Sequence, residues 1–96
     1  LGKATFDLNS GTLAIDGEII ELRNRELRLL EVFVRNKGQL LSKSTLVDRM
    51  FSYAEDVTEN AIEVYVGRLR KKIDPDGQRK PISTLRGQGY RFELQP

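Results

Sequence analysis

Residues 58–73 read TENAIEVYVGRLRKKI, and this stretch decides how the rest of the chain is interpreted. Drawn as a helix, it gathers four apolar side chains on one side, at spacings of four, three and four: Ile62, Val66, Leu69 and Ile73. The other side carries Asn60, Val64, Gly67, Arg68 and Lys71, with Arg70 on the flank. Thr58 is placed to cap this helix, and Pro75 and Gly77 to end it. A basic ridge backed by an apolar stripe predicts a helix that enters the major groove of DNA. A solvated surface helix fits the stretch alone equally well.

Length and composition bound the class of protein. A chain of 96 residues is expected to form a single domain, 1–96, with its own core. Because cysteine is absent, disulfides and thiolate metal sites are excluded, and a reducing compartment is favoured. No apolar run approaches the roughly 20 residues of a membrane span, and no signal-peptide pattern is present. We therefore expect a cytoplasmic protein without membrane contact. Since it begins at Leu1, without methionine, we also expect a fragment of a longer protein.

Charge is unevenly distributed along the chain. The net charge is only +2. Up to Val57 the chain has eight Lys and Arg and nine Asp and Glu, whereas from Thr58 onward it has eight Lys and Arg and five Asp and Glu. Four of those later basic residues lie between Arg68 and Lys72. A local basic patch of this kind predicts contact with a phosphate backbone.

The N-terminal part is expected to form short antiparallel strands. The candidates are Thr5 to Asn9, Thr12 to Asp16 and Glu18 to Leu22, whose apolar residues alternate. Asp16-Gly17 is a strong signal for a tight hairpin, because glycine tolerates a positive φ. A scaffold role for this sheet is the simplest interpretation.

Two helices are expected before residues 58–73. The first runs from Asn24 to Asn36, and Gly38 ends it as a left-handed cap. Its buried side chains are expected to be Leu27, Leu30, Phe33 and Val34. Leu40-Leu41 adds one short strand, and Ser42 caps a second helix, Lys43 to Phe51. A polar connector and the third helix follow, which is helix-turn-helix order with the last helix as the reader.

A glycine-flanked hairpin completes the chain. Ile82 to Arg86 and Tyr90 to Leu94 flank Gly87-Gln88-Gly89, and apolar residues alternate in the second arm. Arg86 stands at the tip. A hairpin that follows a helix-turn-helix is a wing.

Nothing in the sequence indicates catalysis. Histidine and cysteine are both absent, which excludes the usual base–nucleophile pairs and zinc sites. No phosphate-binding loop is present, and Gly87-Gln88-Gly89 lacks the rest of a dinucleotide fingerprint. We expect no enzyme activity, no cofactor and no metal.

Three segments of the chain resemble a known family. NAIEVYVGRLRKKI (60–73), followed by ISTLRGQGYRF (82–92), is similar to the DNA-binding effector domain of OmpR/PhoB-type response regulators. The upstream ELRNRELRLLEVFVRNKGQLLSKSTLVDRMF (21–51) matches the first two helices of that family. The resemblance covers essentially the whole chain. It implies an α+β winged helix-turn-helix with an N-terminal four-stranded antiparallel sheet, three helices and a C-terminal β-hairpin wing.

The resemblance also implies which residues contact DNA. The helix at 58–73 would read the major groove, and the wing at 86–89 would contact the minor groove. The implied base contacts are Val64, Arg68, Arg70 and Arg86. The implied phosphate contacts are Asn60, Tyr65, Lys71 and Thr84. The connector at 52–57 matches a loop that tends to face RNA polymerase in this family, with Tyr53, Glu55 and Asp56 as its candidates.

Three positions depart from the family pattern. Arg23 stands where Thr or Ser usually forms a capping box with the acid at Glu26, so we expect Asn24 to cap instead, or the first turn to fray. Gly67 lies in the helix at 58–73, on the side that is expected to face DNA. We expect it to let the helix backbone lie close to the major groove. Tyr65 stands where His is common. Its hydroxyl reaches a phosphate in one interpretation, and its ring only packs in the other.

Partners follow from the resemblance as well. Proteins of this kind carry an N-terminal receiver domain, outside residues 1–96, that a sensor histidine kinase phosphorylates on an aspartate. Phosphorylated receivers dimerise and place two effector domains on direct-repeat half-sites of double-stranded DNA, so the isolated domain is expected to be monomeric and to bind weakly. Two alternatives stay open. One is the same fold in a membrane-anchored, one-component regulator, and the other is a winged helix that binds an acidic protein surface.

Overall fold

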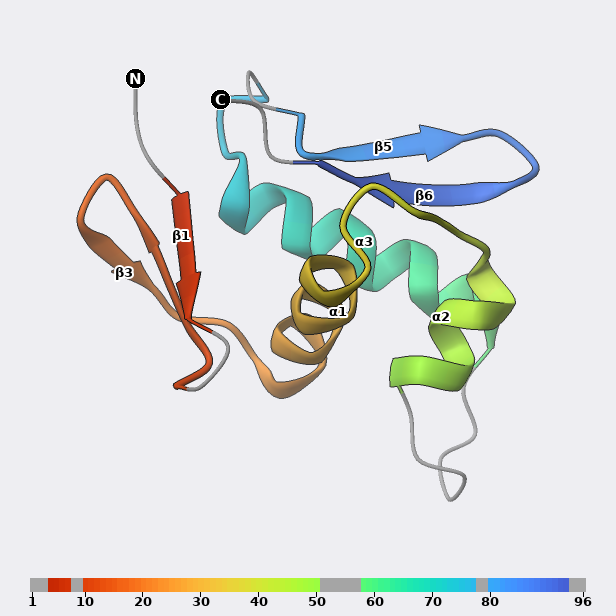
Figure 1. The fold of residues 1–96 in the computed structure, drawn as a ribbon, viewed down its shortest axis with the longest axis horizontal. Coiled ribbons are helices and arrows are strands. Elements are labelled where there is room, and N and C mark those ends of the chain that lie inside the picture. The colour runs from red at the N-terminus through yellow and green to blue at the C-terminus, as the bar shows by residue number, and fades with distance from the viewer. Residues whose placement is uncertain (1–3, 8–9, 51–57, 78–79, 94–96) are drawn as a thin grey trace.

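The computed structural model describes residues 4–7, 10–50, 58–77 and 80–93 (Figure 1). The elements in chain order are β1 (Ala4–Asp7), β2 (Thr12–Ile15), β3 (Glu18–Ile20), α1 (Asn24–Arg35), β4 (Leu40–Leu41), α2 (Lys43–Met50), α3 (Glu59–Ile73), β5 (Ile82–Leu85) and β6 (Gly89–Phe92). The three helices lie together, with the N-terminal sheet on one side and the β5–β6 hairpin on another. This is the α+β winged helix-turn-helix that the sequence predicts.

The N-terminal sheet differs from the expectation in its number of strands. In the described residues it has three antiparallel strands in the order β1-β2-β3, not four. Asp16 and Gly17 form the expected turn, both with positive φ, and Ile15 pairs with Glu18 across it. Only three residues separate the end of β3 from α1, too few for a turn and a further strand. The short strand β4 pairs elsewhere.

The second sheet joins the wing to the middle of the chain. Its order is β4-β6-β5, so β6 lies between the hairpin partner β5 and the two-residue strand β4. Leu41 pairs with Tyr90, and Tyr90 pairs with Thr84 on the other side. The hairpin arms are shifted slightly from the prediction, because Arg86 lies in the turn and Gly89 already belongs to the strand. Leu94 lies outside the described residues.

The core lies between the helices and β6. The most deeply buried large side chains are Phe33, Leu29, Leu30, Leu46, Ile62, Leu69 and Val66. The rings of Phe33 and Phe92 stack with centroids 5.8 Å apart, which joins α1 to the wing sheet. The prediction for α1 was partly wrong: Leu29 and Val32 are buried, whereas Leu27 and Val34 are only partly covered. Because α1 packs against α2, α3 and β6, its buried arc is wider than one stripe.

The start of α1 is held in a way that the sequence did not predict. Asn24 is already helical and Arg23 is the N-cap residue, whose side chain has no acceptor for the free amides. Instead, the Arg23 N–H donates to Glu26 Oε1 at 2.9 Å. Lys72 Nζ, near the end of α3, donates to the same oxygen at 2.6 Å. Glu26 is only 3% exposed, so one buried carboxylate ties the beginning of α1 to the end of α3.

This contact also sets the protonation state of Glu26. Burial alone would raise the pKa of the carboxyl, because it penalises the charged form. The hydrogen bond and charge of Lys72, together with the Arg23 amide, outweigh burial and hold the pKa below its ordinary value. The carboxylate is therefore stabilised in its ionised form by the fold.

The predicted caps of the other two helices are confirmed. The Thr45 N–H donates to Ser42 Oγ at 3.1 Å at the start of α2. The Ala61 N–H donates to Thr58 Oγ1 at 3.4 Å at the start of α3. Phe51 and the connector after it lie outside the described residues, so α2 is described only to Met50. No helix in the described part of the chain is long and apolar enough to cross a membrane.

Candidate nucleic-acid interface

Helix α3 has the two faces that its sequence predicts. Its buried residues are Ile62, Val66, Leu69 and Ile73, and the first three are completely covered. They pack against α1 and α2, which fixes both the position and the rotation of the helix. The opposite face is consequently turned to solvent.

We call the outward side chains of α3 the exposed ridge, and define it as Asn60, Val64, Arg68 and Lys71. Val64 is 51% exposed, a large apolar side chain with no core to cover it. Arg68 and Lys71 form no hydrogen bond or ion pair with any residue that the structure describes, so their charges are available to a ligand. The ridge thus offers two cations and one apolar contact from a helix that the core holds rigidly.

Gly67 lies beside the ridge, halfway along α3. A Cβ built at this position would meet nothing within 4 Å beyond its chain neighbours and the adjacent backbone of α3, so no contact with another described element requires glycine here. The helical backbone is therefore open to an approaching surface at this point. This openness is what the prediction for Gly67 requires.

Tyr65 shows one of the two roles that the sequence left open. Its ring packs at the edge of the core, and its hydroxyl accepts a hydrogen bond from Arg25 Nη1 at 3.0 Å. The Arg25 guanidinium also lies 5.7 Å from the centre of the ring. Packing of the ring is therefore observed, and the phosphate contact of the hydroxyl stays a prediction.

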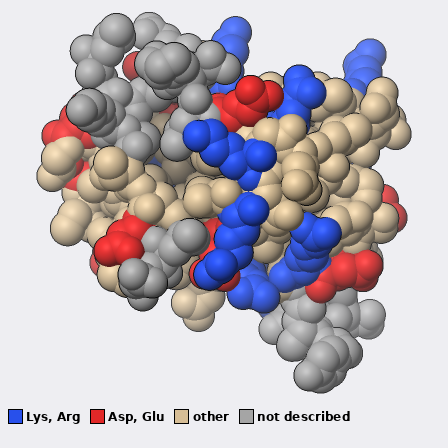
Figure 2. Space-filling model, in the orientation of Figure 1, with Lys and Arg blue, Asp and Glu red and all other residues tan. Residues whose placement is uncertain are grey.

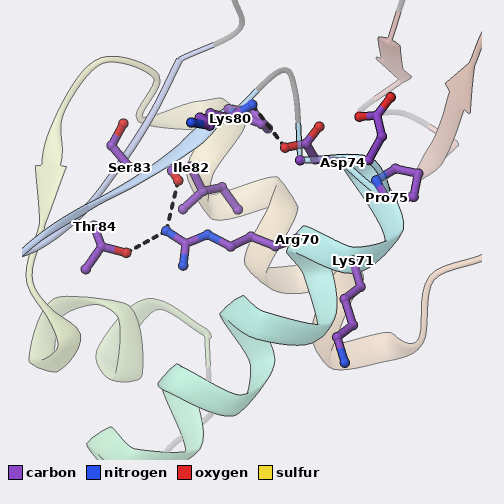
Figure 3. A pocket seen from close by; sticks show the side chains of 11 residues that line it. Arg70, Lys71, Asp74, Pro75, Lys80, Ile82, Ser83 and Thr84 are labelled. Atoms are coloured by element: carbon purple, nitrogen blue, oxygen red, sulfur yellow. Dashed lines mark hydrogen bonds between the residues drawn. The ribbon is translucent and has the colours of Figure 1, made fainter.

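Arg70 lies in surroundings unlike those of Arg68. Its Nη2 donates to the carbonyl oxygen of Ile82 at 2.9 Å and to Thr84 Oγ1 at 2.5 Å, both on β5 (Figure 3). Its guanidinium also lies 5.8 Å from the centre of the Tyr90 ring. The side chain that was predicted to contact a base therefore connects α3 to the wing in this structure.

A shallow groove of about 600 Å³ runs between the end of α3 and β5. Arg70 crosses it, whereas Lys71 points out of the helix in another direction (Figure 3). At the far end of the groove, the Lys80 N–H donates to Asp74 Oδ2 at 3.0 Å and closes the loop that leads into β5. The groove places α3 and the wing side by side on one surface.

The wing tip is the third part of the surface. Arg86 is exposed in the turn between β5 and β6, which the Gln88 N–H closes on Leu85 O at 2.9 Å. Gly87 takes a φ of 72° in this turn, a conformation that favours glycine. The predicted polymerase-facing residues Tyr53, Glu55 and Asp56 lie outside the described residues.

Several basic side chains elsewhere in the described part of the chain pair with acidic neighbours. Figure 2 shows Lys and Arg gathered over the middle of the face seen in Figure 1. In a second groove, Arg28 pairs with Glu31 at 2.9 Å, and Arg49 donates to Asn36 Oδ1 at 2.7 Å. The cations of the exposed ridge lack such partners among the described residues, which distinguishes α3 from this groove.

The chain matches known proteins over most of its length. Residues 17–92 match the family described as "Transcriptional regulatory protein, C terminal". The transcriptional regulatory protein PhoP of Escherichia coli strain K12 is 41% identical over 88 residues, which cover 92% of this chain and 40% of PhoP. The chain thus spans about two fifths of the length of the curated relatives that it matches.

Solved structures also match this chain over most of its length. DrrB of Thermotoga maritima, described as an OmpR/PhoB homologue, superimposes with a TM-score of 0.85 at 26% identity, over 97% of this chain and 42% of that chain. The C-terminal DNA-binding domain of RstA from Klebsiella pneumoniae superimposes with a TM-score of 0.78 at 26% identity, over 95% of this chain and 84% of that chain.

Proposed function

Because the chain belongs to the OmpR/PhoB-type family of transcriptional regulatory C-terminal domains, we propose that it binds double-stranded DNA sequence-specifically, as the effector domain of a two-component response regulator. One observation carries the proposal: α3 is held by a buried apolar stripe and turns outward a ridge whose cations have no partner in the described part of the chain, beside a protruding hairpin. A helix presented in this way fits the major groove of B-form DNA.

Each part of the surface has its own proposed role. Arg68 donates two hydrogen bonds to the N7 and O6 of a guanine, and Val64 contacts a thymine methyl group. Lys71, Asn60 and Tyr65 contact phosphates, which supply affinity and fix the register without reading sequence. Arg86 enters the minor groove from the wing, where narrow A·T-rich DNA attracts arginine.

The proposal extends to the longer protein from which such domains come. Its relatives are about two and a half times as long as the matched segment, which leaves room for a receiver domain. A sensor histidine kinase would phosphorylate that receiver, and paired receivers would place two effector domains on direct-repeat half-sites. RNA polymerase is the proposed partner of the connector at 52–57.

A comparison of two neighbouring cations tests the proposal. Duplexes are first selected by the wild-type chain from a random pool, and affinities are then measured on a selected duplex and on a scrambled one. Arg68→Ala is expected to cost about 1–3 kcal/mol on the selected duplex and much less on the scrambled one. Lys71→Ala is expected to weaken both duplexes alike and to reduce the salt dependence of binding by about one counterion.

Two results would contradict the proposal. Equal losses on both duplexes for Arg68→Ala would remove the reading role of that residue. If the wild-type chain preferred no duplex over another, and bound none in a salt-dependent way, sequence-specific DNA binding would be ruled out. The exposed ridge would then be a docking surface for an acidic protein.

A further inference from the structure

We propose that Arg70 is a positioning residue that fixes the wing against α3 and aims the hydroxyl hydrogen of Thr84 at a phosphate of the DNA backbone. The inference rests on the proposed function and replaces the predicted base contact of Arg70. It assigns Thr84 a specific donor role and makes the contacts of α3 and of the wing depend on each other.

The hydrogen bonds of Arg70 carry the first step. Nη2 has two hydrogens, and both are used, one by the carbonyl of Ile82 and the other by the hydroxyl of Thr84. A guanidinium can form paired, parallel hydrogen bonds along its end, through Nη1 and Nη2, or along its side, through Nε and Nη2. Both arrangements require Nη2. Arg70 therefore cannot grip a guanine with two parallel bonds unless it releases the wing.

The surroundings of the guanidinium carry the second step. It lies 5.8 Å from the centre of the Tyr90 ring, and Tyr90 is only 5% exposed. Tyr90 is the pairing partner of Thr84 on β5 and of Leu41 on β4, so it belongs to the rigid centre of the wing sheet. Arg70 thus joins α3, which the core holds, to β5, which is paired with the buried strand β6. It sets the distance between α3 and β5.

The chemistry of the threonine hydroxyl carries the third step. A hydroxyl has two acceptor lone pairs and one hydrogen. Because Arg70 donates to Thr84 Oγ1, one lone pair is occupied, and the hydrogen is directed away from the guanidinium. Thr84 is exposed and faces the side on which α3 and β5 meet (Figure 3). Its hydrogen is therefore available to an acceptor on the ligand, and phosphate oxygens are the acceptors that DNA presents there.

Ser83 provides a matched control for this geometry. It is exposed, carries a hydroxyl and lies next to Thr84 on β5, but its side chain points to the other side of the strand (Figure 3). Among the described residues, Arg70 donates hydrogen bonds to Ile82 and Thr84, the two neighbours of Ser83, and not to Ser83 itself. Substitution of Ser83 therefore measures the effect of removing any hydroxyl from β5, and substitution of Thr84 measures the effect of removing the oriented hydroxyl.

The test measures affinities of the 96-residue chain for the selected and the scrambled duplex. Thr84→Val is expected to weaken binding about tenfold or more on both duplexes, because a hydrogen bond to a charged phosphate is lost. Thr84→Ser, which keeps the hydroxyl, should recover most of that loss, and Ser83→Ala should change affinity less than about twofold. Arg70→Met should weaken binding more than Thr84→Val does, because the contact of Arg86 is lost together with the oriented hydroxyl. Thr84→Val should add little in the Arg70→Met chain, since the hydroxyl is no longer oriented there.

A second measurement guards against a simple loss of folding in Arg70→Met. Arg86→Ala is made both in the wild-type chain and in the Arg70→Met chain, and the factor by which it weakens binding is compared. A reduced folded fraction lowers both members of a pair alike and leaves that factor unchanged. If Arg70 positions the wing, the factor should fall towards one in the Arg70→Met chain, because the wing no longer reaches the minor groove in register.

The opposite results are equally clear. If Arg70→Met weakened the selected duplex far more than the scrambled one, and its losses added to those of Thr84→Val and Arg86→Ala, Arg70 would read a base and the inference would be wrong. The proposed function would survive that result. A wild-type chain that shifted no duplex would instead contradict the proposed function itself.

Discussion

At residue 89 the fold leaves no space for a side chain. Gly89 has a φ of 138°, and a Cβ built there would lie 2.1 Å from the carbonyl oxygen of Leu41 and 2.8 Å from the Cα of Ser42. Real Cβ atoms do not approach backbone atoms so closely. The glycine therefore lets β6 lie directly against the segment that leads from β4 into α2.

Substitution of Gly89 is accordingly expected to be severe. Gly89→Ala should lower the free energy of unfolding by about 2–4 kcal/mol, because backbone on one side must move. Gly87→Ala is the control, since Gly87 also has a positive φ but a Cβ there would meet no described residue within 4 Å apart from its chain neighbours. It should cost only about 1 kcal/mol. Urea unfolding of both variants measures the difference. Similar losses would show that strain at φ, and not the close approach, dominates at Gly89.

Glu26 gives a prediction about pH. A carboxyl with a lowered pKa in the folded chain stabilises the fold above its unfolded pKa, and that contribution is lost as the pH falls through the folded pKa. At pH 7, Glu26→Gln should cost about 1–2 kcal/mol, because the buried partner of Lys72 loses its charge. The difference from wild type should shrink as the pH falls below 4.5, the ordinary pKa of the group.

Urea midpoints between pH 7 and pH 3 measure this effect. Glu31→Gln is the control: its carboxylate pairs with Arg28 on a more exposed surface, so it should change stability by no more than about 0.5 kcal/mol at any of these pH values. A cost for Glu26→Gln that stayed constant down to pH 3 would mean that shape, and not charge, explains the role of Glu26.

Single residues also show where sequence reasoning stopped. Periodicity placed Arg68 and Arg70 on the outer part of the same helix, and it could not separate them. What separates them is β5, 12 to 14 residues further along the chain, whose approach depends on the whole fold. The contact between Glu26 and Lys72, 46 residues apart, was missed for the same reason. The sequence did contain one signal for this contact: Glu26 lies three positions before the apolar Leu29, which places an acid on the buried side of α1.

At the scale of elements, α3 was predicted almost completely. Its cap at Thr58, its buried stripe and its end before Pro75 are all local properties, written at helical spacing in one stretch. The partner of β4 was not predicted, because a strand of two residues is too short to show the alternation from which its sheet could be assigned. The expected fourth N-terminal strand came from the family resemblance, and the described residues contain three.

Gly67 allows a prediction that concerns the whole of α3. Gly67→Ala should raise the free energy of unfolding by about 0.5–1 kcal/mol, because glycine disfavours helix and the new methyl group meets open space. If the backbone approaches the groove at this point, as proposed, the same methyl group should weaken binding to the selected duplex. Thermal unfolding and a mobility-shift titration measure the two effects. Unchanged or tighter binding would show that the backbone does not approach the DNA at Gly67.

At the scale of the whole molecule, α3 and the wing form the one surface that is proposed to read DNA, and this surface is of modest size. The maximum extents of 37 × 28 × 20 Å leave α3 and the wing to contact a single half-site. Two copies joined by a flexible linker should bind a direct repeat of the selected site about 10²–10⁴-fold more tightly than one copy binds a single site, without any new base contact. Titrations with the repeat spacing changed by half a helical turn provide the control. A gain that did not depend on spacing would argue against a fixed arrangement of half-sites.

The position of β6 has a consequence for how the protein is made. This strand, the last one in the described chain, is the middle strand of its sheet, and it brings Tyr90 and Phe92 into the core. A nascent polypeptide on the ribosome can form its helices earlier, but it cannot cover Phe33 or pair β4 until residue 92 has emerged. Contacts between segments so distant in sequence form slowly. Emergence of β6 from the ribosome, and not the earlier formation of α3, is therefore the event that lets this part of the chain reach its native state.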